Sequence, residues 1–530
     1  MSEKYWSKSG KGHEGPFDTI VIGSGIGGMT AAALLAELGH KVLVLEQHYV
    51  PGGFTHAFKR KKWSWDVGVH AVGEVSERSI PGRILSRLTE GRLEWASLGD
   101  SYDEFHFPEG FTLNYVANQQ RWRDTVVAAF PDEAAAVDRY LDICREIGRS
   151  MRGYYLARIA PGALARPAEA ILARRAQKWM GRTTAEVLAE LTDNPKLRTV
   201  LAAQWGYYGS VPSRSSFVMQ ALVARHFFHG AYYPVGGSGE IARHLLRRVA
   251  EAGGWTRVYA DVEQIVIEEG RAVGVRLGSG EELRARNIVS AAGVMSTVER
   301  LLPPEALGAW VEPVRKLRPA SAHVCLYMGF QGDIRQAGAG SANQWFWHTW
   351  STEHDAWHVD PEAESQPDAP VLYCSFPSLK DPHHEPGPDM LHTGEVVTFV
   401  PWEVFEPFMG GRWKRRGAEY DAFKAKLHAS LKEQFFRHMP QLEPMLRFAE
   451  LGTPLSTDHF VRPMRGSIYG IEPTPERFAC EGLRPRSPIP GLTFAGSEVS
   501  GVGVVGAMMG GVLAAGSVEP LKGLSWMRSV

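Results

Sequence analysis

The chain has 530 residues and a formal net charge of −1 at pH 7, so it carries no global electrostatic field that would recruit nucleic acid. Its length exceeds what one hydrophobic core usually serves, which predicts two domains. Four scattered cysteines without a CxxC pair argue against a disulfide framework and favour a reducing compartment, so we expect a cytoplasmic protein. The polar start, residues 1–15, predicts no secretory leader.

The first predicted elements are an apolar strand at residues 19–22, a glycine-rich turn and a helix of small residues at 29–38. The turn reads GSGIGG, and its place between a strand and a helix is typical of dinucleotide binding. A second strand, 41–45, ends in an acidic residue whose carboxylate is placed to accept hydrogen bonds from ribose hydroxyls. The residues predicted to bind the dinucleotide here are Gly23, Gly25, Gly27, Gly28 and Glu46.

A pair of glycines, Gly52 and Gly53, follows the second strand and offers backbone amides without side-chain bulk, which suits a chain segment that runs along a cofactor. Residues from about 75 to 230 are predicted to be mainly helical. Two uncharged runs, 19–36 and 499–518, are long enough on hydropathy to cross a bilayer. Glycines at turn positions interrupt both runs, so we predict that neither is a membrane span.

A basic segment, residues 145–182, holds nine Lys and Arg residues against two acids and has a local charge of +7. Aromatic and aliphatic residues are interleaved with these cations. This mixture is typical of a helical surface that lies on anionic lipid, with aromatic rings at headgroup depth. We therefore expect a peripheral association with the membrane, against the alternative of a solvated pair of basic helices.

A strand-rich block, 256–291, alternates apolar residues around two turns and predicts antiparallel strands. From 300 to 450, strands mix with aromatic loops, and no histidine there belongs to a recognisable metal-ligand set. The last core strand, 492–496, is predicted to continue through a loop at 497–506 into a helix at 507–515. Residues 501–506 also match GxGxxG, but no ribose-binding acid follows them, so we predict no second dinucleotide. A helix N-terminus here would stabilise negative charge on the first cofactor.

Together these pieces resemble FAD-dependent oxidoreductases of the phytoene desaturase and carotenoid isomerase superfamily, most closely its retinol-saturase-like branch. The resemblance covers nearly the whole chain. Its motifs are the opening turn with its acid, the run from the paired glycines to Phe58 and the WDVGVHAVG run at 65–73. The motifs that are specific to the branch are WGYYG at 205–209, YPVGGSGEIA at 233–242, GTPLST at 452–457 and RGSIYG at 465–470.

The chain departs from the superfamily pattern at two places. After the last core strand it has Gly496-Ser497-Glu498 where most members have Gly-Asp, which leaves open whether the serine or the glutamate meets the cofactor. The frequent arginine after the paired glycines is replaced by Phe54, which removes one phosphate contact.

The resemblance implies an α/β fold in which a Rossmann-type FAD-binding domain is interleaved with an α+β substrate domain. The predicted FAD-binding domain comprises residues 1–75, 231–300 and 450–530, and the predicted substrate domain comprises 76–230 and 301–449. His70 is the expected catalytic residue beside the flavin, since the ordinary pKa of histidine suits proton transfer. The further cofactor-binding residues expected are Gly52, Gly53, Val262, Gly496, Ser497, Glu498, Gly503 and Val504. The residues expected to line a substrate channel are Tyr207, Tyr208 and Tyr469.

The reaction implied is the removal or addition of hydrogen across a carbon–carbon bond of a lipid acyl chain or a carotenoid or retinoid polyene, with FAD as the hydride carrier. The direction and the electron partner stay open. A flavin-dependent cis–trans isomerase, which would leave the substrate mass unchanged, is one alternative. A non-catalytic lipid or flavin carrier is another. An amine oxidase on the same fold is a third, and it should require an aromatic cage beside the flavin.

Overall fold

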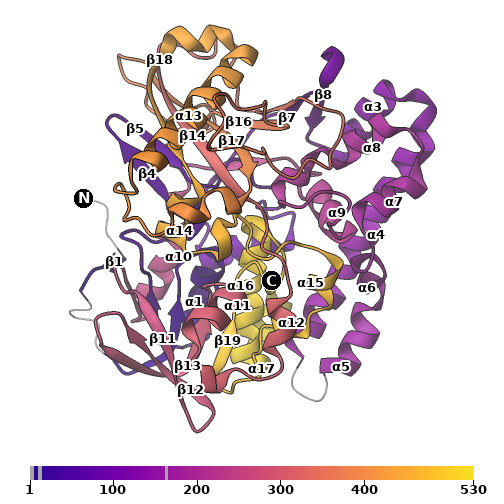
Figure 1. Cartoon of the computed structure of the whole chain (residues 1–530). Coiled ribbons are helices and arrows are strands. Elements are labelled where there is room, and N and C mark those ends of the chain that lie inside the picture. The colour runs from indigo at the N-terminus through magenta and orange to yellow at the C-terminus, as the bar shows by residue number, and fades with distance from the viewer. Residues whose placement is uncertain (1–4, 10–14, 161–164) are drawn as a thin grey trace.

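The computed structural model describes residues 5–9, 15–160 and 165–530 and contains two large sheets (Figure 1). The first sheet has eight strands, in the order β1-β10-β3-β2-β13-β12-β11, with β19 also paired to β13. Its strands are β1 Trp6–Ser7, β2 Phe17–Ile22, β3 Val42–Leu45, β10 Trp255–Arg257, β11 Val262–Glu268, β12 Arg271–Leu277, β13 Glu282–Ser290 and β19 Leu492–Phe494. Strands β1, β10, β3, β2, β13 and β19 run parallel, whereas β11, β12 and β13 form an antiparallel extension.

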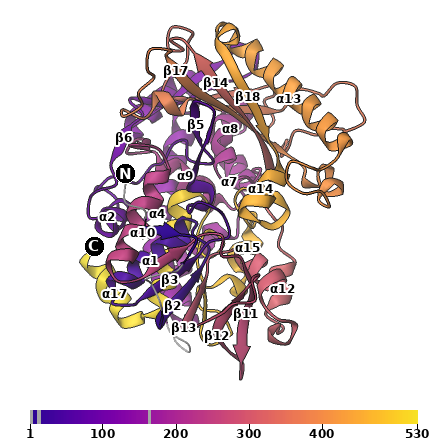
Figure 2. The same ribbon diagram turned by 90° about the vertical axis from the view of Figure 1, so that its left-hand side faces the viewer.

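The buried parts of the parallel strands β2, β3 and β13 are mainly apolar because both faces of the sheet are covered there. Val21, Val44 and Val289 pack under one layer of helices, while Ile20 and Ile288 face a second core on the other side. The helices of the first layer are α1 Ile26–Glu37, α2 Ile80–Leu88, α10 Gly239–Glu251, α16 Gly503–Val518 and α17 Pro520–Ser529. Figure 2 shows this sheet below the second sheet.

The two helices α1 and α16 pack closely although they lie near opposite ends of the chain. Their contact depends on small residues, because an added Cβ at Gly511 of α16 would lie 2.2 Å from the carbonyl oxygen of Gly27 in α1. Both helices begin earlier than their sequences suggested, at Ile26 rather than Met29 and at Gly503 rather than Ala507. The predicted starts were wrong because glycines, which lower helix propensity, are needed in these first turns for close packing.

The second sheet has seven strands in the order β18-β14-β17-β16-β15-β7-β8, and all neighbours are antiparallel except β15 and β7. Its strands are β7 Ser101–His106, β8 Thr112–Val116, β14 Ala322–Gln331, β15 Asn343–Trp347, β16 Val371–Ser375, β17 Leu391–Val400 and β18 Leu446–Gly452. One face packs on helix α13, Ala418–His438, and the other face looks toward the first sheet. The expectation that residues 75–230 are mainly helical misses β7 and β8, which join this sheet.

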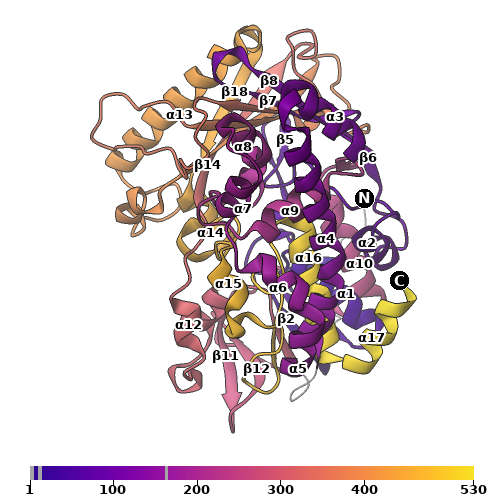
Figure 3. The same cartoon turned by 90° about the vertical axis from the view of Figure 1, so that its right-hand side faces the viewer.

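A layer of helices lies beside both sheets, at the right in Figure 1 and facing the viewer in Figure 3. Its members are α3 Gln119–Ala129, α4 Ala134–Ile159, α5 Ala165–Ala168, α6 Arg174–Met180, α7 Thr184–Leu191, α8 Pro195–Ala202 and α9 Phe217–His226. The long helix α4 contacts α16, so this layer reaches the first sheet as well. The remaining short helices are α11 Val294–Ser296, α12 Val311–Arg315, α14 Pro454–Val461 and α15 Pro475–Ala479.

Two small ribbons link the sheets, and they bear on the predicted domain boundaries. The hairpin of β4 Ala57–Arg60 and β5 Trp63–Asp66 lies within the predicted FAD-binding segment, yet Trp63 and Trp65 donate their indole N–H groups to carbonyls of β14. The second ribbon pairs β6 Trp95–Ser97 with β9 Tyr232–Pro234. The predicted boundary at residue 450 falls inside β18. The division into two domains stays a prediction.

None of the helices in the described part of the chain combines the length and the hydropathy that spanning a bilayer takes. The basic segment 145–182 comprises the end of α4, helix α5, a π-helical turn at Glu169–Ala173 and helix α6, with residues 161–164 outside the described part. Tyr154 and Trp179 are buried in the core, which contradicts the expectation that the aromatic rings of this segment lie at headgroup depth. They are buried because they face the inner side of helices α4 and α6. Ile171 and Leu172 are the exposed apolar residues of the segment, at 76% and 45%.

Candidate active site

One large cavity runs from the turn after β2 to the inner face of the second sheet. At its first end, both the amide and the hydroxyl of Ser24 donate to Oε2 of Glu46, at 2.9 and 2.6 Å, and the amide of His48 donates to Oε1 at 2.8 Å. A carboxylate has about four acceptor positions, so three bonds leave capacity for a ribose hydroxyl. Glu46 lines the cavity, as its predicted role requires.

The cavity floor near this turn is made of backbone. Gly25, Gly496 and Gly503 all line it, and an added Cβ at any of the three would meet no atom within 4 Å and would project into open space. Gly25 is the N-cap of α1, and Gly503 begins α16, so two helix N-termini border the same space. Unpaired N–H groups at helix N-termini bind phosphate oxygens, so this cradle fits the pyrophosphate of a dinucleotide.

Most of the other predicted cofactor residues line the same cavity. These are Gly23, Gly27, Gly52, Gly53, Val262, Ser497, Glu498 and Val504. Gly28 does not line it; an added Cβ there would lie 2.1 Å from the carbonyl oxygen of Gly23, so its role is the close packing of helix on strand. Phe54, which replaces the frequent arginine, lines the cavity without supplying charge. The basic residues Arg300 and Arg462 line the cavity, and Arg462 is paired with Asp261 at 2.6 Å.

Glu498 is buried, and its Oε2 accepts hydrogen bonds from the amides of Val294 and Met295, at 2.6 and 3.1 Å. Burial raises the pKa of this carboxyl group, and the backbone bonds and the guanidinium of Arg477 oppose the rise. The glutamate therefore anchors the loop after β19 to helix α11. Ser497 lines the cavity as well, and which of the two meets the cofactor stays a prediction.

At the other end of the cavity, the inner face of the second sheet carries a cross-strand row of apolar and aromatic residues. Val397, Tyr373 and Trp345 are register partners on β17, β16 and β15, and all three line the cavity. The rings of Trp345 and Tyr373 meet edge-on with centroids 4.6 Å apart. We call these three residues the aromatic row. They form an apolar chamber that adjoins the dinucleotide cradle.

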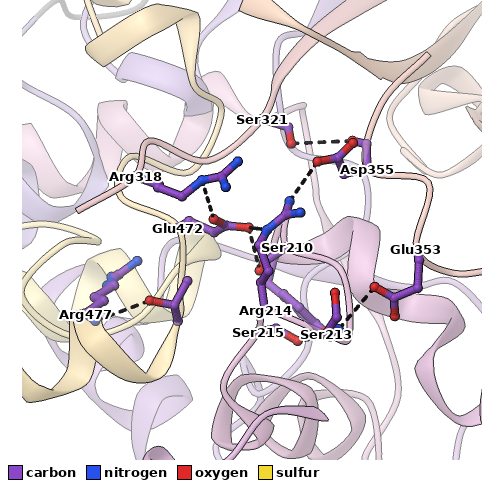
Figure 4. Close-up of polar contacts among 12 residues, drawn as sticks. Ser210, Ser213, Arg214, Ser215, Arg318, Ser321, Glu353, Asp355, Glu472 and Arg477 are labelled. Atoms are coloured by element: carbon purple, nitrogen blue, oxygen red, sulfur yellow. Dashed lines mark hydrogen bonds and ion pairs between the residues drawn. The ribbon is translucent and has the colours of Figure 1, made fainter. Parts of the chain in front are cut away.

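Two of the predicted channel tyrosines face this chamber. Tyr207 and Tyr469 line the cavity, and the hydroxyl of Tyr469 donates to the carbonyl oxygen of Gly206 at 3.2 Å. A polar cluster holds the segments that follow them together (Figure 4). The buried carboxylate of Glu472 accepts from Ser210 at 2.9 Å and from Arg214 at 2.8 Å, and Arg214 also binds Asp355 at 2.9 Å.

Tyr208 lies elsewhere than predicted. It is fully buried in the core beneath the helical layer, where its hydroxyl donates to Oε1 of Gln220 at 2.9 Å, and it is not among the residues around the cavity. The reason is local geometry. Neighbouring residues at the end of the 3-10 helix Ala203–Tyr207 point in different directions, so only one of the two tyrosines can face the chamber.

His70 lines the cavity next to the aromatic row, with its Nδ1 3.1 Å from Oε2 of Glu395 and its ring 5.2 Å from that of Tyr373. Burial, aided by the nearby charge of Lys380, lowers the pKa of His70 to about 3. The premise that His70 has an ordinary histidine pKa is therefore wrong. Burial also raises the pKa of the Glu395 carboxyl group well above its usual value, so burial favours the neutral form of both groups.

Sequence reasoning missed a set of buried polar residues next to His70. Glu395, Ser375, Asn343 and Asp103 lie on four neighbouring strands of the second sheet, and each is at most 1% exposed. Lys380, 4% exposed, reaches into the same set. A signal existed for Glu395, because an acid within an apolar strand is unusual. For Asp103 and Asn343 there was none, since they meet only through a strand pairing across 240 residues.

A backbone cradle for a dinucleotide that opens into an aromatic chamber defines a flavin-dependent oxidoreductase. The family described as "flavin containing amine oxidoreductase" matches residues 26–518, and the chain belongs to this family. The cofactor is therefore FAD, as the sequence predicted, and the predicted α/β architecture with a Rossmann-type FAD-binding fold is confirmed.

Similar proteins of named activity show which enzymes the chain resembles. The chain is 31% identical over 522 residues to the all-trans-retinol 13,14-reductase of Danio rerio, covering 94% of this chain and 85% of the relative. It is 26% identical to the chloroplastic prolycopene isomerase of Arabidopsis thaliana, covering 97% and 84%. Cyclohexylamine oxidase from Brevibacterium oxydans has the same fold, with a TM-score of 0.58 at 17% identity, covering 97% of this chain and all of that one. The resemblance to the retinol-saturase-like branch is thereby confirmed.

Proposed function

We propose that this chain saturates a carbon–carbon double bond of a retinoid or carotenoid polyene. The observation that carries the proposal is the aromatic chamber, which adjoins the cradle for FAD within one cavity. The similarity to all-trans-retinol 13,14-reductases over 94% of the chain supports the direction of the reaction. When bound, FAD supplies the hydride.

The residues of this chain orient the substrate and exclude water from it. The aromatic row presents a flat apolar wall, and Tyr207 and Tyr469 stand beside it. A polyene fits such a wall because burial of its apolar surface stabilises binding by about 25 cal/mol per Å². His70, which burial keeps neutral, is proposed as an uncharged polar contact beside the reacting bond and not as its proton donor.

The exposed residues of the basic segment support a peripheral membrane site. Ile171 and Leu172 are exposed next to Arg174, Arg175 and Lys178, and all three cations are exposed as well. Apolar side chains flanked by cations bind anionic bilayer surfaces. We propose that this surface, named the basic patch, places the enzyme on the membrane from which a hydrophobic substrate is taken.

The test is a single-turnover reaction under anaerobic conditions. The purified holoenzyme is reduced chemically, freed of reductant and mixed with all-trans-retinol or with prolycopene, and the oxidised-flavin absorbance and the product mass are followed. We expect the flavin band to return together with a product that has gained two hydrogens. Apoprotein treated in the same way is the control and should leave the substrate unchanged.

The other outcomes correspond to the alternatives. A product of unchanged mass and altered geometry identifies an isomerase, and bleaching of the oxidised enzyme by substrate with loss of two hydrogens identifies a desaturase. Peroxide release with simple amines would identify an amine oxidase. A polyene that stays bound and chemically unchanged in every redox state of the flavin would identify the protein as a carrier.

A further inference from the structure

A second cross-strand row lies beside the aromatic row on the inner face of the second sheet, and it is polar. Its members are Glu395 on β17, Ser375 on β16, Asn343 on β15 and Asp103 on β7. Each lies two positions along its strand from a member of the aromatic row or, for Asp103, from Phe105, the register partner of Trp345. Glu395 pairs with Ser375, and Asn343 pairs with Asp103. We call these four residues the polar row. Buried polar groups are costly unless they are bonded, so a whole row of them calls for a function.

Asp103 is the centre of the bonding. Its Oδ1 accepts from the hydroxyl of Tyr207 at 2.7 Å and from Nδ2 of Asn343 at 2.9 Å, and its Oδ2 accepts from Nε2 of Gln204 at 3.0 Å. Gln204 and Tyr207 both come from the 3-10 helix that follows α8. A completely buried acid is thus joined by one hydrogen bond to a phenol that lines the chamber.

Lys380 lies one side chain away from Asp103 and can compensate the negative charge of that acid. Its Nζ donates to Oδ1 of Asn343 at 2.5 Å, to Oγ of Ser375 at 2.7 Å and to the carbonyl oxygen of His70 at 2.8 Å. All three acceptors are neutral, so the lysine has no direct ion pair. Burial lowers the pKa of Lys380, and the carboxyl groups that oppose this in their charged forms are those of Glu395, Asp103 and Asp66. A cation held one side chain away from Asp103 stabilises that acid once it has lost a proton.

Tyr207 and Tyr373 both face the chamber, but only Tyr207 has a proton source behind it. The rings of the two tyrosines lie 5.8 Å apart, edge to face. The hydroxyl of Tyr373 is buried and makes no hydrogen bond to a carboxyl group in the described part of the chain; its polar neighbour there is Tyr207. Nδ2 of Asn343 also donates to the hydroxyl oxygen of Tyr207, at 3.1 Å, which would stabilise that oxygen as negative charge develops on it.

We propose that Tyr207 is the catalytic proton donor of the reaction, with Asp103 as its proton source and Lys380 as a positioning residue; this rests on the proposed saturation. In the step, the O–H bond of Tyr207 breaks as a C–H bond forms at one carbon of the double bond, and the other carbon would receive the hydride that bound, reduced FAD supplies. The proton of Asp103 passes to the Tyr207 oxygen, which reverses the hydrogen bond that Tyr207 donates to Asp103 in the structure. Asp103 is left as a carboxylate that takes a proton from solvent after the product has gone.

The protonation states fit this sequence. Burial raises the pKa of Asp103, although the hydrogen bonds from Asn343, Tyr207 and Gln204 lower it, and the net rise favours the protonated acid before the reaction. Burial also raises the pKa of Tyr207 well above its ordinary value, which favours the protonated phenol. Burial lowers the pKa of Lys380 to about 7, with the three acids around it opposing the change. A lysine that titrates near neutrality can take up charge when Asp103 loses its proton.

The first experiment measures the protonation of Asp103 and its coupling to Tyr207 without turnover. Infrared difference spectra of the oxidised holoenzyme in water and deuterium oxide should show the carbonyl stretch of a buried carboxylic acid that disappears in Asp103→Asn and shifts in Tyr207→Phe. Tyr208→Phe is the matched control, since it removes a buried hydroxyl one residue away that does not touch Asp103. Glu395→Gln assigns the band of the second buried acid. Loss of a carboxylate band instead of an acid band in Asp103→Asn would overturn the proposal.

The second experiment follows saturation by the reduced holoenzyme. Tyr207→Phe should slow product formation by about 100-fold or more, as expected for loss of a general acid. Tyr208→Phe should stay within about twofold of the wild type, the change that loss of a distant hydroxyl produces. A Tyr207→Phe variant as fast as the wild type would exclude Tyr207 as the donor. If the wild-type enzyme saturates no polyene, the proposed function fails, while the infrared result still decides whether Asp103 holds a proton for Tyr207.

Discussion

Two glycines two positions apart in the first turn should respond to alanine in opposite ways. At Gly27 an added Cβ would lie 2.5 Å from the Cα of Gly496 and 2.8 Å from the carbonyl oxygen of Ala507, so helices α1 and α16 must separate. At Gly25 the backbone is extended, with φ −60° and ψ 165°, and an added Cβ meets no atom within 4 Å. The first change strains the fold, and the second only fills the FAD cradle.

The expected magnitudes follow from these contacts. Overpacking of a close helix contact costs about 1–3 kcal/mol, so Gly27→Ala should lower the stability of the apoprotein by that amount. Gly25→Ala should leave apoprotein stability unchanged or raise it by about 0.4–1 kcal/mol, because alanine restricts the unfolded chain and adopts the native dihedrals without strain. Its Cβ displaces a phosphate that binds against backbone, so affinity for FAD should fall at least about tenfold, or about 1.4 kcal/mol.

The assay has two readouts. Urea unfolding of flavin-free protein, followed by tryptophan fluorescence, measures stability, and titration of FAD into the same protein measures affinity. The reasoning is refuted if Gly25→Ala destabilises the apoprotein as much as Gly27→Ala does, or if it binds FAD as tightly as the wild type.

Two further predictions concern acid and membranes. His56, His70 and His323 have pKa values near 4, 3 and 4 against 6.5 for an ordinary histidine, because burial disfavours their charged forms. The unfolded chain therefore binds more protons than the native chain below pH 6.5, so the protein should lose stability as the pH is lowered from 6.5 to 4. His323→Leu should make this loss smaller, as measured by urea midpoints across that range. At the basic patch, Arg174→Gln, Arg175→Gln and Lys178→Gln together should weaken cosedimentation with anionic liposomes about 100-fold, at about 1 kcal/mol per cation. Equal loss with Lys59, Lys61 and Lys62 changed to Gln, which removes the same charge elsewhere, would contradict a role specific to the patch.

The dinucleotide cradle could be predicted from sequence because its signal is local. A strand, a glycine-rich turn, a helix and a strand ending in Glu46 follow one another within about thirty residues, and each element needs only its neighbours. The sequence did not reveal the chamber in the same way. Strand β7 was missed because its partner β15 comes more than 200 residues later, and β8 was missed with it because, among the described strands, β8 pairs only with β7.

The errors at the site have the same origin. Tyr207 and Tyr208 are indistinguishable in sequence, and only the end of a 3-10 helix separates a ring in the chamber from a ring in the core. The pKa of His70 depends on burial beneath strands from the middle of the chain, so its type alone suggested the wrong protonation behaviour. The aromatic residues of the basic segment were assigned to the surface because the sequence shows the charge of a segment but not which side of each helix faces the core.

The contact between α1 and α16 also sets the order in which the molecule can mature on the ribosome. The first half of the FAD cradle is made within the first fifty-odd residues, but Gly496, Ser497, Gly503 and Val504 complete it from the far end of the chain. At about 5–20 residues per second, the nascent cradle stays half-built for tens of seconds. The cradle for FAD is therefore complete only once residue 504 has been made, and a chain that stops before residue 490 should not be rescued by added flavin.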